Sequence, residues 1–278
     1  MSLTKDKKKD KKKDKKKDKK KDKKQKCEFK CKKICCQKNY YFKRIEIVYK
    51  SIKLNYIFWI TTLISIGLIT FYTNQKEHVY SSIISGIISF ICAMCFGYTI
   101  HSLSHTNDAC LLYKDSKFSI IKYFKSKPWL NKLIINFFTY TCDFHDKIHH
   151  DPTINKQPIN IIIETIINFF IEGGFLILFT TYTNFNINLN SYTFRFNRAI
   201  LFLWAMLYAT VHNINYNIKS PIQHMNHHKE YNTNFGIDTL DILFDTKYDI
   251  ENIEIFNHAA INMAIITCFI LYFKILLT

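Results

Sequence analysis

Long apolar stretches dominate the chain from about residue 50 onward. A helix needs ~20 mostly apolar residues to cross the hydrocarbon core of a bilayer. Two stretches reach about this length without any charged residue, Leu54–Tyr72 and Tyr80–Ile100, and a short polar turn separates them. They predict a pair of antiparallel membrane-spanning helices.

Three further apolar runs follow. Ile159–Asn184 is long but is interrupted by two glutamates and a Gly-Gly pair, whereas Ala199–Val211 is short on its own. Ala259–Leu277 is a last apolar helix that either spans the membrane or packs on the bundle. Residues 101–158 hold only short apolar patches, which suit interfacial or partly buried helices. The pattern predicts an all-α integral-membrane helical bundle, with about four spanning helices plus a C-terminal helix.

Charge is concentrated at the N-terminus. Residues 1–40 hold 20 Lys against five Asp and one Glu, so most of the net charge of +17 lies there. A repeated Lys-Lys-Lys-Asp unit has nothing apolar to bury and repels itself, so it predicts disorder. We expect three parts: a disordered Lys-rich tail (1–40) with a juxtamembrane cysteine cluster, a membrane domain (41–258) and the C-terminal apolar helix (259–278).

The tail is either low-complexity sequence without a specific role or a segment that lies near anionic lipid head groups. Nucleic acid is the less favoured partner, because no aromatic residue is interleaved with the lysines before Phe29. By the positive-inside rule the tail belongs in the cytosol. The first helix pair then returns the chain to the cytosol at His101. The runs Ile159–Asn184 and Ala199–Val211 can form a second pair, which does not fully cross as two straight rods and returns the chain near His212. Arg195 and Arg198 weigh mildly against this orientation.

Histidines carry the clearest chemical signal, since nine of the 11 fall into three groups. Histidines at positions i and i+3 or i+4 share one face of a helix, so each group can aim two or three imidazoles at one point. Two metal ions with three or four nitrogens each would use most of the nine. The candidate metal ligands are His101, His105, His145, His149, His150, His212, His224, His227 and His228.

A lone histidine is usually structural, and we interpret His78 and His258, which stand apart, in that way. Imidazole suits Zn, Cu, Fe and Ni, so spacing alone does not identify the metal. The chain has no His-Glu-x-x-His, no Gly-x-Ser-x-Gly and no nucleotide-binding motif, so reducing electrons would come from a separate protein. The predicted spans are nearly free of histidine, which favours an enzyme over the alternative, a non-enzymatic histidine-rich membrane metal-binding protein.

The set His-x3-His, His-x3-His-His and His-x2-His-His resembles the fatty acid hydroxylase superfamily, which includes sterol desaturases. The resemblance covers about residues 50–250 and is best at 224–246, where His-His is followed by Asn-Phe-Gly and Asp-x-Leu-Phe. The chain departs from the family pattern at Leu240, where Trp is usual, and at Asp245, where Gly is usual. It also has three residues rather than two between His145 and His149.

The resemblance implies a cytosolic, histidine-rich metal cap on a four-helix membrane body. It implies two non-haem iron ions, O2 as co-substrate and electrons from a cytochrome b5-type donor. The reaction would be hydroxylation of a lipid C–H bond in a fatty acyl, sphingolipid or sterol substrate, or alternatively desaturation at the same di-iron site. We expect an integral protein of the endoplasmic reticulum membrane, with its N-terminus and histidines in the cytosol.

Ligating histidines usually donate their second ring N–H to a carboxylate or carbonyl. Asp241, which matches an Asp of the family, is the preferred partner, with Asp146 and Asp238 as further candidates. Glu164 and Glu172 fall at membrane depth, where a carboxylate is costly and often functional. Glu164 is close enough to the boundary that it could simply reach water.

Overall fold

The chain separates into two units, Met1–Tyr49 and Lys50–Thr278. In the first unit, residues 40–49 are helical. Apart from Tyr40, the predictions for the Lys-rich tail and its cysteine cluster lie outside the described residues. The computed structural model describes residues 40–73, 79–105, 115, 117, 119–144, 157–183, 186–189, 192–230 and 232–277.

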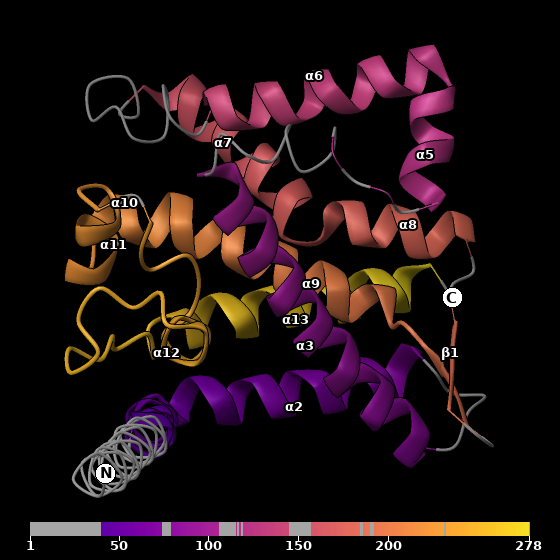
Figure 1. Cartoon of the computed structure of the whole chain (residues 1–278). Coiled ribbons are helices and arrows are strands. Elements are labelled where there is room, and N and C mark those ends of the chain that lie inside the picture. Colours follow the sequence, from indigo (N-terminus) through magenta and orange to yellow (C-terminus); the bar gives the residue numbers. More distant parts are fainter. Residues whose placement is uncertain are drawn as a thin grey trace, which may run out of the picture. The chain divides into compact units, whose positions relative to one another are not determined.

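The second unit is mostly helical (Figure 1). Two of its segments, η2 and η3, are single turns of π-helix. The helices are α2 (Tyr56–Thr73), α3 (Val79–Ser104), α5 (Ser119–Ser126), α6 (Pro128–Phe144), α7 (Pro158–Phe169), η2 (Phe170–Gly174), α8 (Phe175–Thr183), α9 (Arg198–Thr210), η3 (Val211–Asn215), α10 (Tyr216–Ile218), α11 (Ile222–His227), α12 (Asp238–Phe244) and α13 (Ala259–Leu276).

Four helices are long and apolar enough to cross a membrane. They are Tyr56–Thr73, Tyr80–Ser104, Pro158–Tyr182 and Ala259–Leu276. This confirms the coarse prediction of a helical membrane protein. The C-terminal helix is one of the four, whereas the sequence pattern treats it as an addition to four others. The run at 199–211, expected as the fourth span, forms the 13-residue α9 instead.

Helix α9 lies at the centre of the bundle, and η3 and α10 continue it without a break. It packs against α2, α3, α7, α8, η2 and α13. Its side chains are buried on several sides, since Leu201, Trp204, Ala205 and Leu207 are all in the core. A helix enclosed by protein is apolar all round without contacting lipid. By contrast, α2 and α13 expose many large apolar side chains on their outer faces, as lipid-facing helices do.

Asn197 fixes the start of α9. Its side-chain oxygen accepts hydrogen bonds from the backbone N–H groups of Ala199 and Ile200, at 3.1 and 3.2 Å. Its amide donates to Thr73 at the end of α2, and its backbone N–H donates to Ser89 in α3. Asn is a preferred helix N-cap residue. One residue therefore positions α9 against two neighbouring helices.

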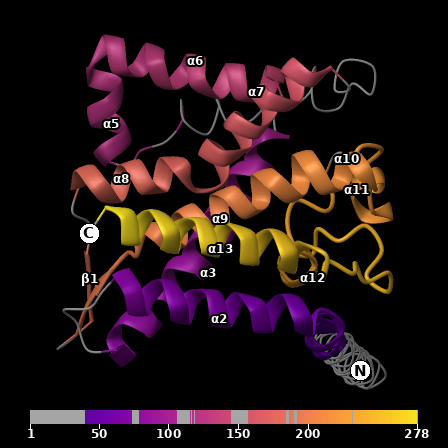
Figure 2. The same cartoon turned by 180° about the vertical axis from the view of Figure 1, so that it is seen from behind.

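The long helices of the second unit extend between two opposite ends of the bundle (Figures 1 and 2). Helices α10, α11 and α12 lie at one end. At the other end the strands β1 (Asn186–Leu189) and β2 (Tyr192–Arg195) form an antiparallel pair in which Ile187 lies opposite Phe194. This hairpin departs from the all-α prediction. Its signal was present in the sequence, since apolar and polar residues alternate with a period of two in β1.

Glycines allow close packing around η2. A Cβ at Gly173 would lie 3.0 Å from the Ala205 Cβ and 3.1 Å from the Leu201 carbonyl oxygen, both on α9. A Cβ at Gly97 of α3 would overlap the Glu172 carboxylate. Glu172 is buried there, so α3 and η2 can approach only because position 97 carries no side chain.

We predict that Gly97→Ala destabilises the protein, whereas Gly67→Ala does not. At position 97 the added methyl group meets the Glu172 carboxylate and lies 3.3 Å from the Glu172 Cα, and overpacking of this kind costs ~1–3 kcal/mol. At position 67 of α2 a Cβ meets nothing within 4 Å. Thermal unfolding of the detergent-solubilised protein measures the effect. Equal midpoints for the two variants would contradict this account of the α3–η2 contact.

Candidate metal centre

Three histidines converge at the end of α3. His101 lies in the last turn of α3, His105 directly follows the end of this helix, and His227 reaches them from α11. Their ligand nitrogens all lie within 4.8 Å of one another, a geometry that could hold one metal ion. His101 is buried and His227 is 0% exposed. We name these three residues the first histidine group.

Hydrogen bonds fix the orientation of two of these rings. His227 Nδ1 lies 2.6 Å from the Thr233 carbonyl oxygen, which only accepts, so Nδ1 carries the proton and Nε2 presents its lone pair. Burial lowers the pKa of His227 to about 4, so the ring is neutral at neutral pH, as a metal ligand must be. His101 Nδ1 lies 3.0 Å from the Tyr208 hydroxyl, which can accept a hydrogen bond from Nδ1–H and leave the Nε2 lone pair for a metal.

A second histidine group lies beside the first. It consists of His212 in η3, His224 in α11 and His228, which caps the C-terminus of α11. The Nε2 atoms of His224 and His228 are 3.0 Å apart. Two nitrogens bound to one ion at ~2.1 Å and ~90° to each other are separated by ~3.0 Å. The rings of His212 and His224 are 4.7 Å apart between centroids.

The two groups adjoin. The ring centroids of His227 and His228 are 5.9 Å apart, and those of His101 and His212 are 6.5 Å apart. Burial lowers the pKa of His228, which also favours its neutral form. Among the described residues, only the first group brings three ligand atoms within 4.8 Å of one another, so it is the group whose geometry could hold a metal ion.

One carboxylate reaches the second group. Glu164, on the second turn of α7, is buried, and its Oε1 lies 3.6 Å from His212 Nε2. The structure therefore does not bear out the expectation that Glu164 simply reaches water. The other glutamate at membrane depth, Glu172, lies against Gly97 of α3.

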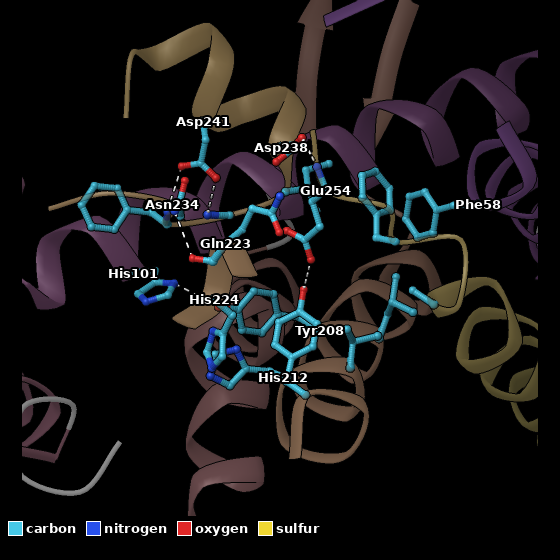
Figure 3. A pocket seen from close by; sticks show the side chains of 18 of the residues that line it. Phe58, His101, Tyr208, His212, Gln223, His224, Asn234, Asp238, Asp241 and Glu254 are labelled. Carbon is cyan, nitrogen blue, oxygen red and sulfur yellow. Dashed lines mark hydrogen bonds between the residues drawn. The ribbon is translucent and has the colours of Figure 1, made fainter. Parts of the chain in front are cut away.

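A cavity of about 70 Å³ borders both histidine groups (Figure 3). His101, His212 and His224 lie on one side of it, and acidic residues lie on the other. Pockets for drug-sized ligands measure roughly 300–1,000 Å³, so this space can admit only a small part of a large ligand. Its apolar wall consists of Phe58, Trp204, Leu207, Val211, Phe256 and Ala259.

Asp241, the preferred carboxylate partner, orders a loop beside the first group. It accepts hydrogen bonds from the backbone N–H groups of Phe235 and Gly236, at 2.8 and 3.1 Å, and from the Thr246 hydroxyl at 2.7 Å. The Phe235 ring lies 5.3 Å from the His105 ring between centroids. Asp241 thus positions a residue that packs against the ligands.

Asp238 has a similar role further along the same segment. It pairs with Lys247 and accepts a hydrogen bond from the Glu254 backbone N–H at 2.8 Å. Glu254 in turn accepts a hydrogen bond from the Tyr216 hydroxyl at 2.8 Å, and the Tyr216 ring lies 4.9 Å from the His224 ring between centroids. The buried carboxylates therefore tie the 234–254 segment to the metal-binding end of the bundle.

The structure brings together six of the nine predicted ligands. The prediction for His145, His149 and His150, and that for Asp146 as a carboxylate partner, lie outside the described residues. The sequence reading did not anticipate Tyr208 or the Thr233 carbonyl as partners of histidines. Tyr208 had a usable signal, because it precedes His212 by four residues in one continuous helical segment.

We predict that the stability of the metal-free protein depends on protonation of Glu254. Burial, with a smaller contribution from Asp238, raises the pKa of Glu254 from 4.5 to about 7. Between these values the folded protein binds more protons than the unfolded chain, so stability is full below about pH 4.5 and falls as the pH rises towards 7. A shift of this size corresponds to ~3 kcal/mol.

Glu254→Gln keeps the shape and an oxygen acceptor for Tyr216 but cannot ionise. Thermal unfolding at pH 5 and at pH 7.5 should show that the wild type loses more stability on going to the higher pH than the variant does. Parallel pH profiles for the two proteins would contradict a protonated Glu254.

Comparison with protein-family models, curated proteins and solved structures finds no match to this chain. The geometry of the histidine groups therefore carries the functional argument, together with the membrane-spanning length of the helices.

Proposed function

We propose that the chain is a membrane-bound oxygenase that hydroxylates a C–H bond of a lipid, using O2, two histidine-held iron ions and electrons from an external donor. The observation that carries the proposal is the pair of adjoining histidine groups at one end of a bundle with four potential membrane spans. A metal centre there would lie at the end of α3, within reach of a substrate that enters from the bilayer.

Each histidine group would hold one ion. His101, His105 and His227 would provide three nitrogens for the first, and His212, His224 and His228 three for the second. The predicted ligands His145, His149 and His150 would add to these sets. Bound iron would supply O2 activation and abstraction of a hydrogen atom from an unactivated carbon.

The residues around the ligands would hold them in the correct state. The Thr233 carbonyl keeps the proton of His227 on Nδ1, and the Tyr208 hydroxyl can do the same for His101. Such partners orient ligating imidazoles and tune their basicity. The apolar cavity wall, including Trp204 and Leu207, would exclude water and orient a short stretch of hydrocarbon beside the metals.

The distribution of histidines favours an oxygenase over a metal carrier. A carrier should place polar ligands along the length of its spans, but α2 and α13 contain no histidine. The described candidate ligands instead lie at the end of α3, in η3 and in or beside α11. The proposed orientation puts this end in the cytosol, where a cytochrome b5-type protein could deliver electrons.

The proposal predicts that His227→Ala and His228→Ala each abolish lipid oxidation and lower the iron content of the purified protein. Each variant removes a ligand from one group, so each should lose mainly one of the two ions. The chain would be expressed in iron-fed cells, with metal content measured by elemental analysis and lipids by mass spectrometry. A product one oxygen atom heavier indicates a hydroxylase, and one lacking two hydrogen atoms indicates a desaturase.

His258→Ala is the matched control. His258 is exposed, lies at the start of α13 and is outside both histidine groups, so the variant should retain iron and product. Bound zinc without a change in the lipids would contradict the oxygenase and favour a metal-binding role. Full activity in either ligand variant would contradict the assignment of that group.

A further inference from the structure

We infer that Glu164 is a ligand of the second metal ion, so that this ion is held by mixed nitrogen and oxygen donors while the first is held by imidazole. The inference rests on the proposed function, since it assigns a role to a residue at the same centre. It concerns a carboxylate that no histidine pattern identifies.

The position of Glu164 calls for a cation. It lies on α7 within a helix long enough to span a membrane, and it is only 2% exposed. An ionised carboxylate buried in apolar surroundings is strongly unfavourable unless it is paired or coordinates a metal. Its carboxylate faces the Asn168 side chain and His212, one of the three imidazoles of the second histidine group.

The distance between the two side chains fits a shared ion. Glu164 Oε1 and His212 Nε2 are 3.6 Å apart, which is too long for a hydrogen bond. Two donor atoms bound to one ion at ~2.1 Å, with an angle of ~120° between the bonds, are ~3.6 Å apart. The 3.0 Å between His224 Nε2 and His228 Nε2 fits an angle of ~90° by the same reasoning. Both separations thus match the spacing of two donor atoms on one ion, and in the metal-free protein they correspond to a hydrogen bond and an ion pair.

Charge balance supports the same assignment. A divalent ion with three neutral imidazole ligands keeps a net charge of +2 inside the protein, where water solvates it poorly. One carboxylate ligand lowers the net charge of the centre to +1. Histidine combined with carboxylate is also a donor set typical of non-haem iron(II). A first ion held nearby by the first histidine group would increase the benefit of a negative ligand on the second ion.

A metal-free ion pair between Glu164 and a protonated His212 is the competing explanation. In that case His212 could not ligate a metal, and Glu164 would act only by orienting the ring. Outer partners of this kind change metal affinity by ~10–100-fold, whereas loss of a direct ligand should exceed that range. Metal affinity therefore separates the two explanations.

The test is an anaerobic titration with Fe(II) of the purified full chain in nanodiscs. The measured quantity is the number of Fe(II) equivalents bound at each free Fe(II) concentration. The wild type should bind two equivalents. Glu164→Gln should retain one tight equivalent and bind the second more than about 100-fold more weakly. Glu172→Gln is the matched control, because Glu172 is equally buried in the same span but lies against Gly97, and it should bind two equivalents as tightly as the wild type.

Infrared difference spectra give a second readout that needs no stable variant. In the wild type, the second equivalent of Fe(II) should shift a carboxylate stretching band, and the first should not. The shift should persist in Glu172→Gln and be absent in Glu164→Gln. A second equivalent that binds without any carboxylate shift would overturn the inference even if Glu164→Gln failed to fold.

These outcomes distinguish the inference from the proposed function. Two tight equivalents in both the wild type and Glu164→Gln would overturn the role of Glu164 and leave the oxygenase intact. No iron in the wild type would overturn both. Two equivalents with the predicted effect of Glu164→Gln, but no lipid oxidation, would support the carboxylate ligand and contradict the oxygenase.

Discussion

Imidazoles from three separate helical segments, α3, η3 and α11, lie close together at one end of the bundle, and much of the surrounding structure holds them there. A metal centre tolerates only small errors in ligand position. The core contributes a central helix, α9, whose position is fixed by the helices packed around it and by the Asn197 cap at its start. Because η3 continues directly from α9, the buried core sets the position of His212.

The segment after α11 fixes the positions of His224, His227 and His228. Asp241 holds the Phe235–Gly236 backbone, and Thr246 links this segment to Tyr98 of α3. Polar groups are therefore concentrated where the backbone leaves regular helix. Within the spans, threonine hydroxyls donate to carbonyls one turn earlier, which satisfies them away from water. Polar interactions fix the site and apolar packing fixes the bundle.

The sequence predicts most of the bundle because membrane length and apolar composition are local properties. The same holds for His101/His105 and for His224, His227 and His228, whose spacing determines that they share a helix face. Asp245 is instructive, since the resembled family usually has Gly there. Its φ of 65° is left-handed, a conformation that Gly adopts freely and Asp more readily than most residues, so the departure fits the same turn.

What the sequence does not predict depends on contacts between distant segments. Helix α9 is buried because six other elements pack around it, which the sequence does not show. From the sequence alone its apolar run therefore resembles a short membrane-spanning segment. The Thr233 carbonyl has no side-chain signature, and its role follows only from the fold of the loop after α11. The approach of Glu164 to His212 likewise joins residues 48 positions apart. The β1–β2 hairpin was missed because its strands are short beside the long apolar runs.

The most direct test of the central claim is to locate bound iron in the folded protein. Crystals of the full chain grown with iron would be measured at wavelengths on either side of the iron absorption edge. The account predicts two anomalous peaks, one among His101, His105 and His227 and one among His212, His224 and His228. A map without peaks at these histidines, or with iron bound only elsewhere, would contradict a paired metal centre.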